Sequence, residues 1–415
     1  MPNRTARALA VAALGEWRQG RRFADGIIQE LLAPSALDSS DRSFAVELFY
    51  GVLRNLTLLD FWIGRLRAGG LDDDSRDLLR VGLYQLFILR TPGHAAVFET
   101  VSIAPRRKRP LVNGVLRASL RRFAELETAA AATPLATRCS HPQLLVARWS
   151  QAFGEAATSA LCEWNNQPAP IYARVHQPVI TPEQFRAVHP DATVVPGWPR
   201  FVHLTNVPIA ALARGQCYVQ DPSTSVACEL LDPQPGEAVL DACAAPGGKS
   251  GLLAELMQNR GSLVACDRDI ERISTLRANL QRLGVTIAST VRHDWRSGPL
   301  LKKSAESFDR ILIDAPCTNT GVMRRRVDLR WRLTKDDFRR VPDEQMQILR
   351  AVLPHLKLGG TLVYSTCSIE PEENEEVVQR AVREFPFLQL TEQKSILPFR
   401  DGFDGAFAAK FRRAA

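Results

Sequence analysis

The sequence of 415 residues predicts three domains: an all-α domain over 1–130, a small α+β connecting domain over 137–220 and an α/β domain over 221–415. Helical periodicity with hardly any strand-like alternation runs through the first part of the chain. In the last part, short apolar runs alternate with helical segments, which is typical of a doubly wound, mostly parallel sheet. The chain is long enough for each domain to bury a core of its own.

The composition is that of an ordinary globular protein, with 45% hydrophobic and 24% charged residues, and no apolar run approaches the length of a membrane span. A formal net charge of +8 moderately favours a polyanionic partner. The eight cysteines show neither Cys-x-x-Cys spacing nor a nearby His-x-x-x-His pair, so no metal site is expected. Without a secretory signal a disulfide framework is not expected either, and we expect a cytosolic protein with reduced thiols.

The predicted helical domain carries two basic features. Residues 106–109 read Arg-Arg-Lys-Arg between two prolines and predict a compact cationic loop. Arg117 and Arg121 lie one turn apart on the next predicted helix and therefore share a face. Both features are ordinary for a solvated surface, and only the chemistry predicted farther along the chain favours contact with nucleic acid.

Between the helical and α/β domains the signals are mixed. The alanine- and threonine-rich stretch 127–136, which contains Pro134, predicts a linker. A short helix is expected over 144–153 and a strand over 171–175, and prolines punctuate the rest. These signals predict the small α+β domain.

The α/β domain contains four short apolar runs that predict strands, with helices between them. The expected strands are 238–240, 262–265, 311–313 and 361–364, and the expected helices are 249–258, 270–283 and 343–357. Sheets of this kind bind ligands at the carboxyl ends of their strands. Four chemically capable residues fall at those ends: Asp241, Asp267, Asp314 and Cys367.

A glycine-rich turn at 245–249, Ala-Pro-Gly-Gly-Lys, follows the first of these strands and opens a helix. Its glycines let the backbone approach a ligand, and a helix N-terminus favours a negative group. It matches neither the dinucleotide nor the nucleoside-triphosphate motif. A ligand with a carboxylate and a ribose but no phosphate would fit, as S-adenosylmethionine does, although an ordinary strand-to-helix turn would read the same way.

Two aspartates extend this ligand hypothesis. Asp267 comes about 20 residues after the glycines, where an acidic side chain accepts hydrogen bonds from ribose hydroxyls. Asp294 follows the third strand-like run and is a candidate for contact with the adenine amine. The alternative for a strand-end aspartate is a turn former or a helix cap.

Two cysteines lie in polar loops at strand ends, whereas a structural cysteine is usually found inside an apolar run. They are Cys317, in the segment 314–321, and Cys367, in the segment 364–368. A thiolate that adds to carbon 6 of a pyrimidine makes carbon 5 nucleophilic, and the adduct must afterwards be eliminated. This chemistry needs one attacking cysteine and a second group for release, and Asp314 is placed to bond the base. The residues alone do not rank the two thiols.

A second basic segment follows Cys317: Arg-Arg-Arg at 324–326, then Arg330, Trp331 and Arg332. Cations next to an aromatic side chain suit phosphate contact and base stacking beside an active site. The alternative is a solvated basic helix.

At the motifs 241–249, 314–317 and 364–368 the chain resembles the Sun/Fmu family of RNA cytosine-5 methyltransferases, and the resemblance covers nearly the whole chain. Residues 82–86, 94–97 and 112–117 resemble the helical domain of this family, which is similar to the antitermination factor NusB. The sequence departs from the family pattern at 174–176, at 326–328 and in the short basic segment 103–110.

The resemblance implies a NusB-like RNA-binding domain, a connecting domain and a class I (Rossmann-like) methyltransferase domain. It implies a monomeric cytosolic enzyme, without a membrane partner, that transfers a methyl group from S-adenosylmethionine to carbon 5 of a cytosine in 16S ribosomal RNA. By position, Cys367 would be the nucleophile, Cys317 the release cysteine and Asp314 a contact to the base. The implied cofactor-binding residues are Cys243, Ala244, Ala245, Pro246, Gly247, Gly248, Lys249, Asp267, Asp294 and Asp314.

Two rival hypotheses stay open at this point. One is the same chemistry on transfer RNA. The other is a non-catalytic RNA-binding protein, such as a ribosome-assembly or antitermination-like factor, with an idle methyltransferase domain.

Overall fold

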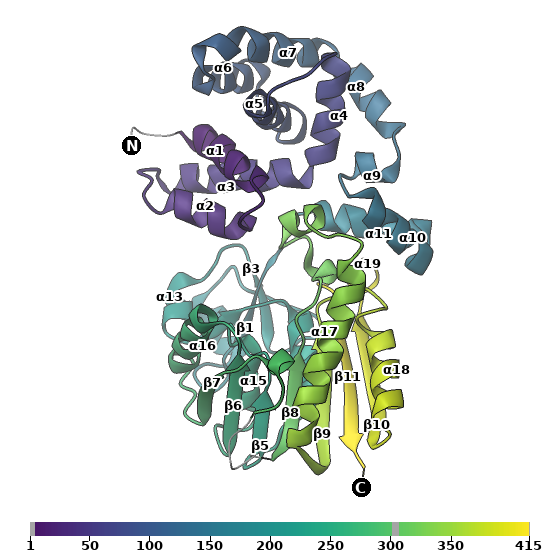
Figure 1. Cartoon of the computed structure of the whole chain (residues 1–415). Coiled ribbons are helices and arrows are strands. Elements are labelled where there is room, and N and C mark those ends of the chain that lie inside the picture. The colour runs from purple at the N-terminus through teal and green to yellow at the C-terminus, as the bar shows by residue number, and fades with distance from the viewer. Residues whose placement is uncertain (1–4, 301–306, 415) are drawn as a thin grey trace. The chain divides into compact units, whose positions relative to one another are not determined.

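The computed structural model describes residues 5–300 and 307–414. The chain forms two compact units (Figure 1). The first comprises Met1–Gln167 together with Met323–Arg332, and the second comprises Pro168–Val322 and Leu333–Ala415. The division after residue 167 falls inside the expected connecting domain, so the helices just before it group with the first unit.

The described part of the first unit is helical, as the sequence predicts. Its buried residues form one apolar core that includes Leu48, Phe49 and Leu83, all fully buried. The helices are α1 (Ala6–Arg18), α2 (Ala24–Leu32), α3 (Ser39–Arg54), α4 (Leu56–Leu66), α5 (Asp73–Leu83), α6 (Gly93–Ile103), α7 (Arg109–Arg121), α8 (Phe123–Ala131), α9 (Leu135–Arg138), α10 (Gln143–Phe153) and α11 (Glu155–Asn166).

The linker expected over 127–136 is wrong, because α8 and α9 occupy most of it. Alanine is the strongest helix former, and Leu126 and Ala130, one turn apart, bury their side chains in the core of this unit. Pro134 lies just before the first residue of α9, where a missing N–H costs nothing. The alanines and the burial of one face therefore make most of this stretch helical, and the threonines and Pro134 do not make it a linker.

The second unit begins with a small four-stranded antiparallel sheet of order β2-β3-β1-β4. Its core is formed by side chains such as Ala173, Phe185 and Val202. The strand expected over 171–175 is found at those residues. The elements are β1 (Ile171–Val175), α12 (Pro182–Val188), β2 (Thr193–Val194), β3 (Phe201–Leu204), α13 (Ile209–Ala213) and β4 (Cys217–Val219).

The rest of the second unit is built on a seven-stranded sheet of order β10-β11-β9-β8-β5-β6-β7. Figure 1 shows its strands side by side, from β7 on the left to β10 on the right. Strands β5 to β9 are mutually parallel, and β11 is antiparallel to β9 and β10, which confirms a mostly parallel sheet. The strands are β5 (Ala238–Asp241), β6 (Ser262–Asp267), β7 (Ala288–Arg292), β8 (Phe308–Asp314), β9 (Leu356–Thr366), β10 (Leu388–Ile396) and β11 (Ala406–Arg413).

Both faces of this sheet are buried. Ile311 and Ile313 of β8 pack into the core that contains α17 and α18, while Leu312 between them packs into the core that contains α14 and α15. This is why the parallel strands read as continuous apolar runs. The helices are α14 (Val226–Leu231), α15 (Gly248–Leu256), α16 (Ile270–Arg282), α17 (Asp337–Val352), α18 (Glu375–Glu384) and α19 (Pro398–Asp401).

One expected helix is displaced. The sequence predicts a helix over 343–357, whereas α17 begins at Asp337, continues through Pro342 and ends at Val352. The chain then enters β9 at Leu356, which pairs with Phe308 at the start of β8. The end of the predicted helix is a strand because it pairs with β8. This pairing is a tertiary contact and cannot be predicted from the local sequence.

Candidate functional site

The topology brings the predicted strand-end residues to one edge of the large sheet. Asp241, Asp267 and Asp314 are the last residues of β5, β6 and β8, and Cys367 directly follows β9. Asp314 lies opposite Ser365 in the parallel pairing of β8 with β9. Because parallel strands end at the same edge, the cysteine loops and the glycine turn belong to one site.

The two cysteine sulfurs face each other across this site. The Sγ atoms of Cys317 and Cys367 are 3.3 Å apart, and the Cys367 thiol also lies 3.1 Å from Asn319 Oδ1, to which it donates. The hydrogen bond with Cys367, together with burial, raises the pKa of Cys317 well above its usual value. Cys317 therefore keeps its proton at neutral pH.

A buried carboxylate joins the two cysteine loops. Glu373 is 0% exposed. It accepts hydrogen bonds from the Thr318 backbone N–H at 2.9 Å, from the Thr318 hydroxyl, from the Ser368 hydroxyl at 2.6 Å and from Gln345 Nε2 at 3.0 Å. Thr318 follows Cys317 and Ser368 follows Cys367, so one side chain fixes both loops. Glu373 lies before α18, which begins at Glu375, so this carboxylate belongs to the loop after β9.

The backbones of the loops also meet directly. The Gly321 N–H donates to the Cys367 carbonyl at 3.0 Å, and the Gly405 N–H donates to the Gly321 carbonyl at 2.8 Å. A Cβ atom on Gly321 would lie 2.7 Å from both the Cys367 oxygen and Gly405 Cα. Only glycine permits this approach.

We expect Gly321→Ala to destabilise the protein by about 1–3 kcal/mol, because two backbone segments would have to separate. The melting temperature measured by circular dichroism should fall by several degrees. Gly114 on α7 has open space around it, so Gly114→Ala is the matched control and should leave the melting temperature unchanged or slightly higher. Equal melting temperatures for Gly321→Ala and the wild type would contradict the close packing of the loops.

An ion pair connects the glycine turn to the cysteine loops. Lys249 Nζ lies 2.8 Å from Asp314 Oδ2, and the Ser365 hydroxyl donates to Asp314 Oδ1 at 3.0 Å. Burial opposes the charge on Lys249, but the charge and hydrogen bond of Asp314 outweigh it and raise the pKa of Lys249. The side chains stay 20% and 31% exposed, so the pair can meet a ligand.

The glycine turn is held open toward the edge of the sheet. Gly247 has φ = +107°, in the left-handed region that favours glycine. Arg272 of α16 donates to the Ala245 carbonyl at 2.6 Å, and the Ala245 N–H donates to Asp267 Oδ2 at 3.2 Å. At the start of α15 the first N–H groups have no intrahelical acceptor. These N–H groups could donate to a ligand carboxylate, and the nearby Asp267 could accept hydrogen bonds from ribose hydroxyls. The turn therefore fits a ligand with a carboxylate and a ribose diol.

The remaining aspartates have partners of their own. Asp241 is fully buried and accepts from the Ser250 hydroxyl at 2.6 Å, and burial raises its pKa to about 7. Asp294 is held by Arg296, whose Nε and Nη2 lie 3.0 and 2.7 Å from its two oxygens. This hydrogen-bonded pairing lowers the pKa of Asp294 to about 2. Contact between Asp294 and an adenine stays a prediction, and Arg296 competes for the same carboxylate.

Comparison with known proteins then identifies the family. The family model for the 16S rRNA methyltransferase RsmB/F matches residues 228–412, the NusB family model matches 4–121, and the model of the RsmF/B-like ferredoxin-like domain matches 141–188. The chain is 33% identical over 451 aligned residues to the probable ribosomal RNA small subunit methyltransferase B of Bacillus subtilis, with 100% of both chains covered. The chain belongs to the RsmB/F family of 16S rRNA methyltransferases.

A further curated relative and a solved structure agree with this assignment. Ribosomal RNA small subunit methyltransferase B of Escherichia coli (strain SMS-3-5 / SECEC) is 38% identical over 407 residues, which covers 92% of this chain and 94% of that protein. The crystal structure of a methyltransferase homologue from Pyrococcus horikoshii is 31% identical with a TM-score of 0.59, over 67% of this chain and 97% of that one. The predicted fold class, with its NusB-like, connecting and Rossmann-like domains, is confirmed.

Several side chains of the basic segment 324–332, which follows the Cys317 loop, are buried in the first unit and not available beside the site as predicted. Arg330 is fully buried in the first unit and donates to Asn166 Oδ1 at 2.7 Å and to the Asn165 carbonyl at 3.0 Å. Trp331 Nε1 donates to the Leu53 carbonyl at 2.9 Å. Arg324 is 2% exposed and lies 3.8 Å from the centre of the Trp164 ring. The prediction of RNA contact is wrong for Arg324 and Arg330, because they fasten the segment to helices of the first unit, whereas contact by the exposed Arg326 stays a prediction.

The basic segment 106–109 is only partly the solvated loop that was predicted. It forms a 3₁₀ turn over Arg106–Lys108 that leads into α7. Lys108 is 8% exposed and forms ion pairs with Asp72 and Asp74. Arg106 and Arg107 are exposed. Contact with RNA by these two stays a prediction.

Sequence reasoning missed a clamp between the small sheet and the glycine turn of this RsmB/F protein. Arg174 of β1 is 0% exposed and donates to the Gly248 carbonyl at 3.1 Å. His176, two residues on, lies 3.1 Å from Glu255 Oε2 and 3.0 Å from the Leu283 carbonyl. The signal was present as the unusual triplet Arg-Val-His at 174–176, but its partners on α15 and after α16 are visible only in three dimensions.

No helix within residues 5–300 and 307–414 combines the length and the apolar character needed to cross a membrane. Within the same described ranges, no group of three or more His, Cys, Asp or Glu side chains is arranged to hold a metal ion.

Proposed function

We propose that this RsmB/F protein methylates carbon 5 of a cytosine in 16S ribosomal RNA through a covalent adduct of Cys367 with carbon 6 of the base. The observation that carries the proposal is the pair of sulfurs 3.3 Å apart, with the Lys249–Asp314 pair beside them. S-adenosylmethionine, bound beside the glycine turn, would supply the electrophilic methyl group. The target base has to leave its stack to reach the thiols.

Cys367 adds as a thiolate to carbon 6, so that carbon 5 becomes an enamine carbon able to attack a methyl group. Asp314 bonds the base edge and favours this addition. The new carbon–sulfur bond leaves Cys367 as an uncharged thioether. Loss of the carbon-5 proton and cleavage of the bond to Cys367 then restore the aromatic pyrimidine.

The position of Cys317 beside Cys367 supports a part for Cys317 in that last step. In the free enzyme the hydrogen bond with Cys367 keeps the proton on Cys317 by raising its pKa. Once the Cys367 sulfur is bonded to carbon, that hydrogen bond and the nearby charge are gone, so the pKa of Cys317 falls. Cys317 then releases its own proton to solvent, its thiolate accepts the carbon-5 proton, and the electron pair of that C–H bond re-forms the double bond as Cys367 departs as a thiolate.

The cofactor residues proposed by position are Cys243 to Lys249, with Asp267, Asp294 and Asp314. Gly247 and Gly248 provide the open turn, Asp267 the acceptor for ribose hydroxyls, and Lys249 orients Asp314. Arg174 acts as a positioning residue through its bond to Gly248.

We expect Arg174→Met to weaken S-adenosylmethionine binding about tenfold in titration calorimetry, or about 1.4 kcal/mol, because the carbonyl that begins α15 loses its charged donor. Arg174→Lys keeps a charge and should recover part of the affinity. Arg214→Met, at an exposed position of the same small domain, is the control and should bind as the wild type does. A folded Arg174→Met variant with wild-type affinity would refute the positioning role.

The function is tested by comparing methyl incorporation into naked 16S RNA and into bulk transfer RNA, followed by bisulfite sequencing of ribosomal RNA from a deletion strain. We expect transfer to 16S RNA and loss of one protected cytosine in the deletion strain. Transfer to transfer RNA alone would favour the rival substrate. Failure to bind S-adenosylmethionine in calorimetry would favour a non-catalytic binding protein.

A further inference from the structure

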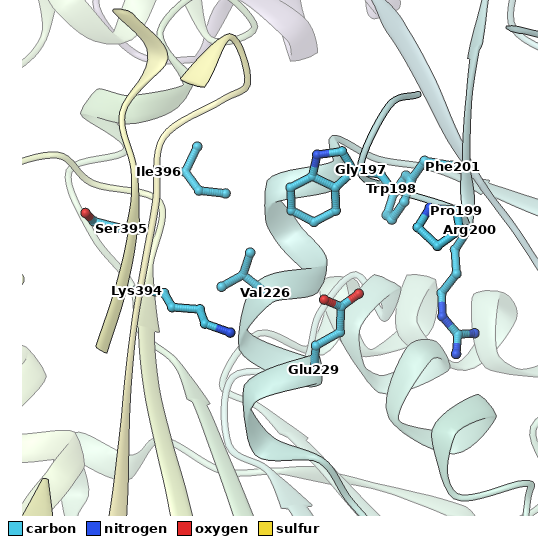
Figure 2. Close-up of a pocket in the computed structure, with 10 residues that line it drawn as sticks. All are labelled: Gly197, Trp198, Pro199, Arg200, Phe201, Val226, Glu229, Lys394, Ser395 and Ile396. Atoms are coloured by element: carbon cyan, nitrogen blue, oxygen red, sulfur yellow. The ribbon is translucent and has the colours of Figure 1, made fainter. Parts of the chain in front are cut away.

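A cavity of about 610 Å³ lies outside the site described so far (Figure 2). Its walls come from three elements of the second unit: the segment 197–201 that leads into β3, the helix α14 with Val226 and Glu229, and the edge strand β10 with residues 394–396. The volume is in the range of pockets that hold small organic ligands. None of the residues proposed for catalysis or cofactor binding lines it.

The strand register places this cavity beside the cysteine loops. Ser395 of β10 lies opposite Phe407 of β11, and Phe407 lies opposite Thr366 of β9, the residue before Cys367. Two strand spacings separate Ser395 from Thr366, or roughly 10 Å. The cavity therefore lies at the same edge of the sheet as the site.

A second connection runs through the loop before β11. The rings of Trp198 and Phe403 are 5.5 Å apart at 70°. Two residues after Phe403, Gly405 donates to the Gly321 carbonyl, which is part of the Cys317 loop. The aromatic wall of the cavity thus contacts Phe403, in the same loop as the Gly405 that supports the Cys317 loop.

The chemistry of the lining suits an unstacked base. Trp198 is half-buried and packs edge-on with Phe201, at 6.1 Å and 83°, so its ring is held in place. Figure 2 shows the Trp198 ring, the Lys394 ammonium and the Glu229 carboxylate directed into the same space. An aromatic ring offers stacking to any base, a carboxylate accepts from an exocyclic amine, and an ammonium suits phosphate.

Neighbouring groups limit which of these side chains are available. Arg200 is part of the wall, since it lies 2.6 Å from Glu255 and 2.9 Å from Gln177. Lys394 forms an exposed ion pair with Glu392 at 3.1 Å. Exposed pairs are weak, so a phosphate can compete for Lys394.

We propose that this cavity binds a nucleotide of the RNA substrate close to the target cytosine, with its base stacked on Trp198 and its phosphate near Lys394. The inference rests on the proposed function, since it assumes an RNA substrate. A base that leaves its stack disrupts the neighbouring stacking, and single-stranded nucleotides are commonly bound on aromatic side chains. The cavity would hold such a neighbour while the target base lies at the thiols.

The test uses the full-length protein and naked 16S RNA, with steady-state methyl transfer and ultraviolet cross-linking as separate readouts. For Trp198→Ala and Lys394→Glu we expect KM for RNA to rise about tenfold, with kcat and KM for S-adenosylmethionine within twofold of wild type. Trp198→Phe should restore most of the KM. Lys357→Glu is the charge control, because Lys357 is a similarly exposed paired lysine at the start of β9.

Cross-linking separates this inference from the function itself. In the wild type, RNA should cross-link to the peptide that contains Trp198, whether or not methyl transfer is detected. Transfer to 16S RNA with unchanged KM in both variants and no such cross-link would overturn the nucleotide site and leave the proposed function standing. A cross-link at Trp198 without any methyl transfer would overturn the proposed function and leave the nucleotide site standing. Lys394→Glu changes an exposed side chain, so it tests the site even if Trp198→Ala fails to fold.

Discussion

Replacement of Cys317 by alanine is expected to trap the RNA on the enzyme. With Cys317 absent, Cys367 still adds to carbon 6 and the base is still methylated, but the step that removes the carbon-5 proton and frees Cys367 lacks its assistant. Turnover should fall by a factor on the order of 10³ or more. A covalent protein–RNA complex should appear on a denaturing gel.

Cys367→Ala provides the opposite result. It removes the attacking sulfur, so neither turnover nor a covalent complex is expected. Cys139→Ala, at a cysteine of the first unit remote in sequence from both motifs, is the control and should retain activity without an adduct. An adduct in Cys367→Ala and none in Cys317→Ala would reverse the two roles.

The second large effect is expected at Glu373. In all its hydrogen bonds to the cysteine loops, the Glu373 carboxylate is the acceptor. The donors are the Thr318 N–H, the Thr318 hydroxyl and the Ser368 hydroxyl. Glu373→Gln replaces one accepting oxygen by an NH₂ group, which would face donors. One loop then loses its support, and a small displacement of a reacting group is costly. We expect kcat to fall about 100-fold, or about 2.7 kcal/mol.

The position of Glu373 makes this a test of alignment. KM for S-adenosylmethionine should change little, because the glycine turn does not contact Glu373. Glu384→Gln, at the last residue of α18 and in a surface pair with Arg350, is the matched control and should keep wild-type kcat. A Glu373→Gln enzyme with wild-type kcat would show that the loops are held in register by other contacts.

Much of the catalytic edge of the sheet could be predicted from the sequence, for a physical reason. Parallel strands leave continuous apolar runs, and a chemically capable residue directly after such a run must lie at the carboxyl edge. This logic placed Asp314, Cys317 and Cys367 together without any knowledge of distances. The strand expected over 171–175 is likewise found at those residues, as β1.

The missing parts depend on contacts between distant segments. Arg330 was predicted to be available for RNA because its neighbours in sequence are polar, but it is buried against Asn166, 164 residues away. In the sequence Glu373 was indistinguishable from the other glutamates around it, since only its partner Thr318 in another loop shows that it is an internal acceptor. In both cases the charge of the residue predicted an exposed position. A buried charged group needs hydrogen-bonding partners, and the sequence does not show which distant residues provide them.

The most direct measurement for the central claim uses 16S RNA that contains 5-fluorocytidine, in which the atom to be removed from carbon 5 is fluorine, so the adduct cannot be released. After incubation with the wild-type enzyme and S-adenosylmethionine, trypsin separates the two candidate cysteines, because Cys317 lies in the peptide 311–324 and Cys367 in the peptide 358–380. We expect mass spectrometry to find the nucleotide on the peptide 358–380. A nucleotide on the peptide 311–324, or on neither, would contradict attack by Cys367.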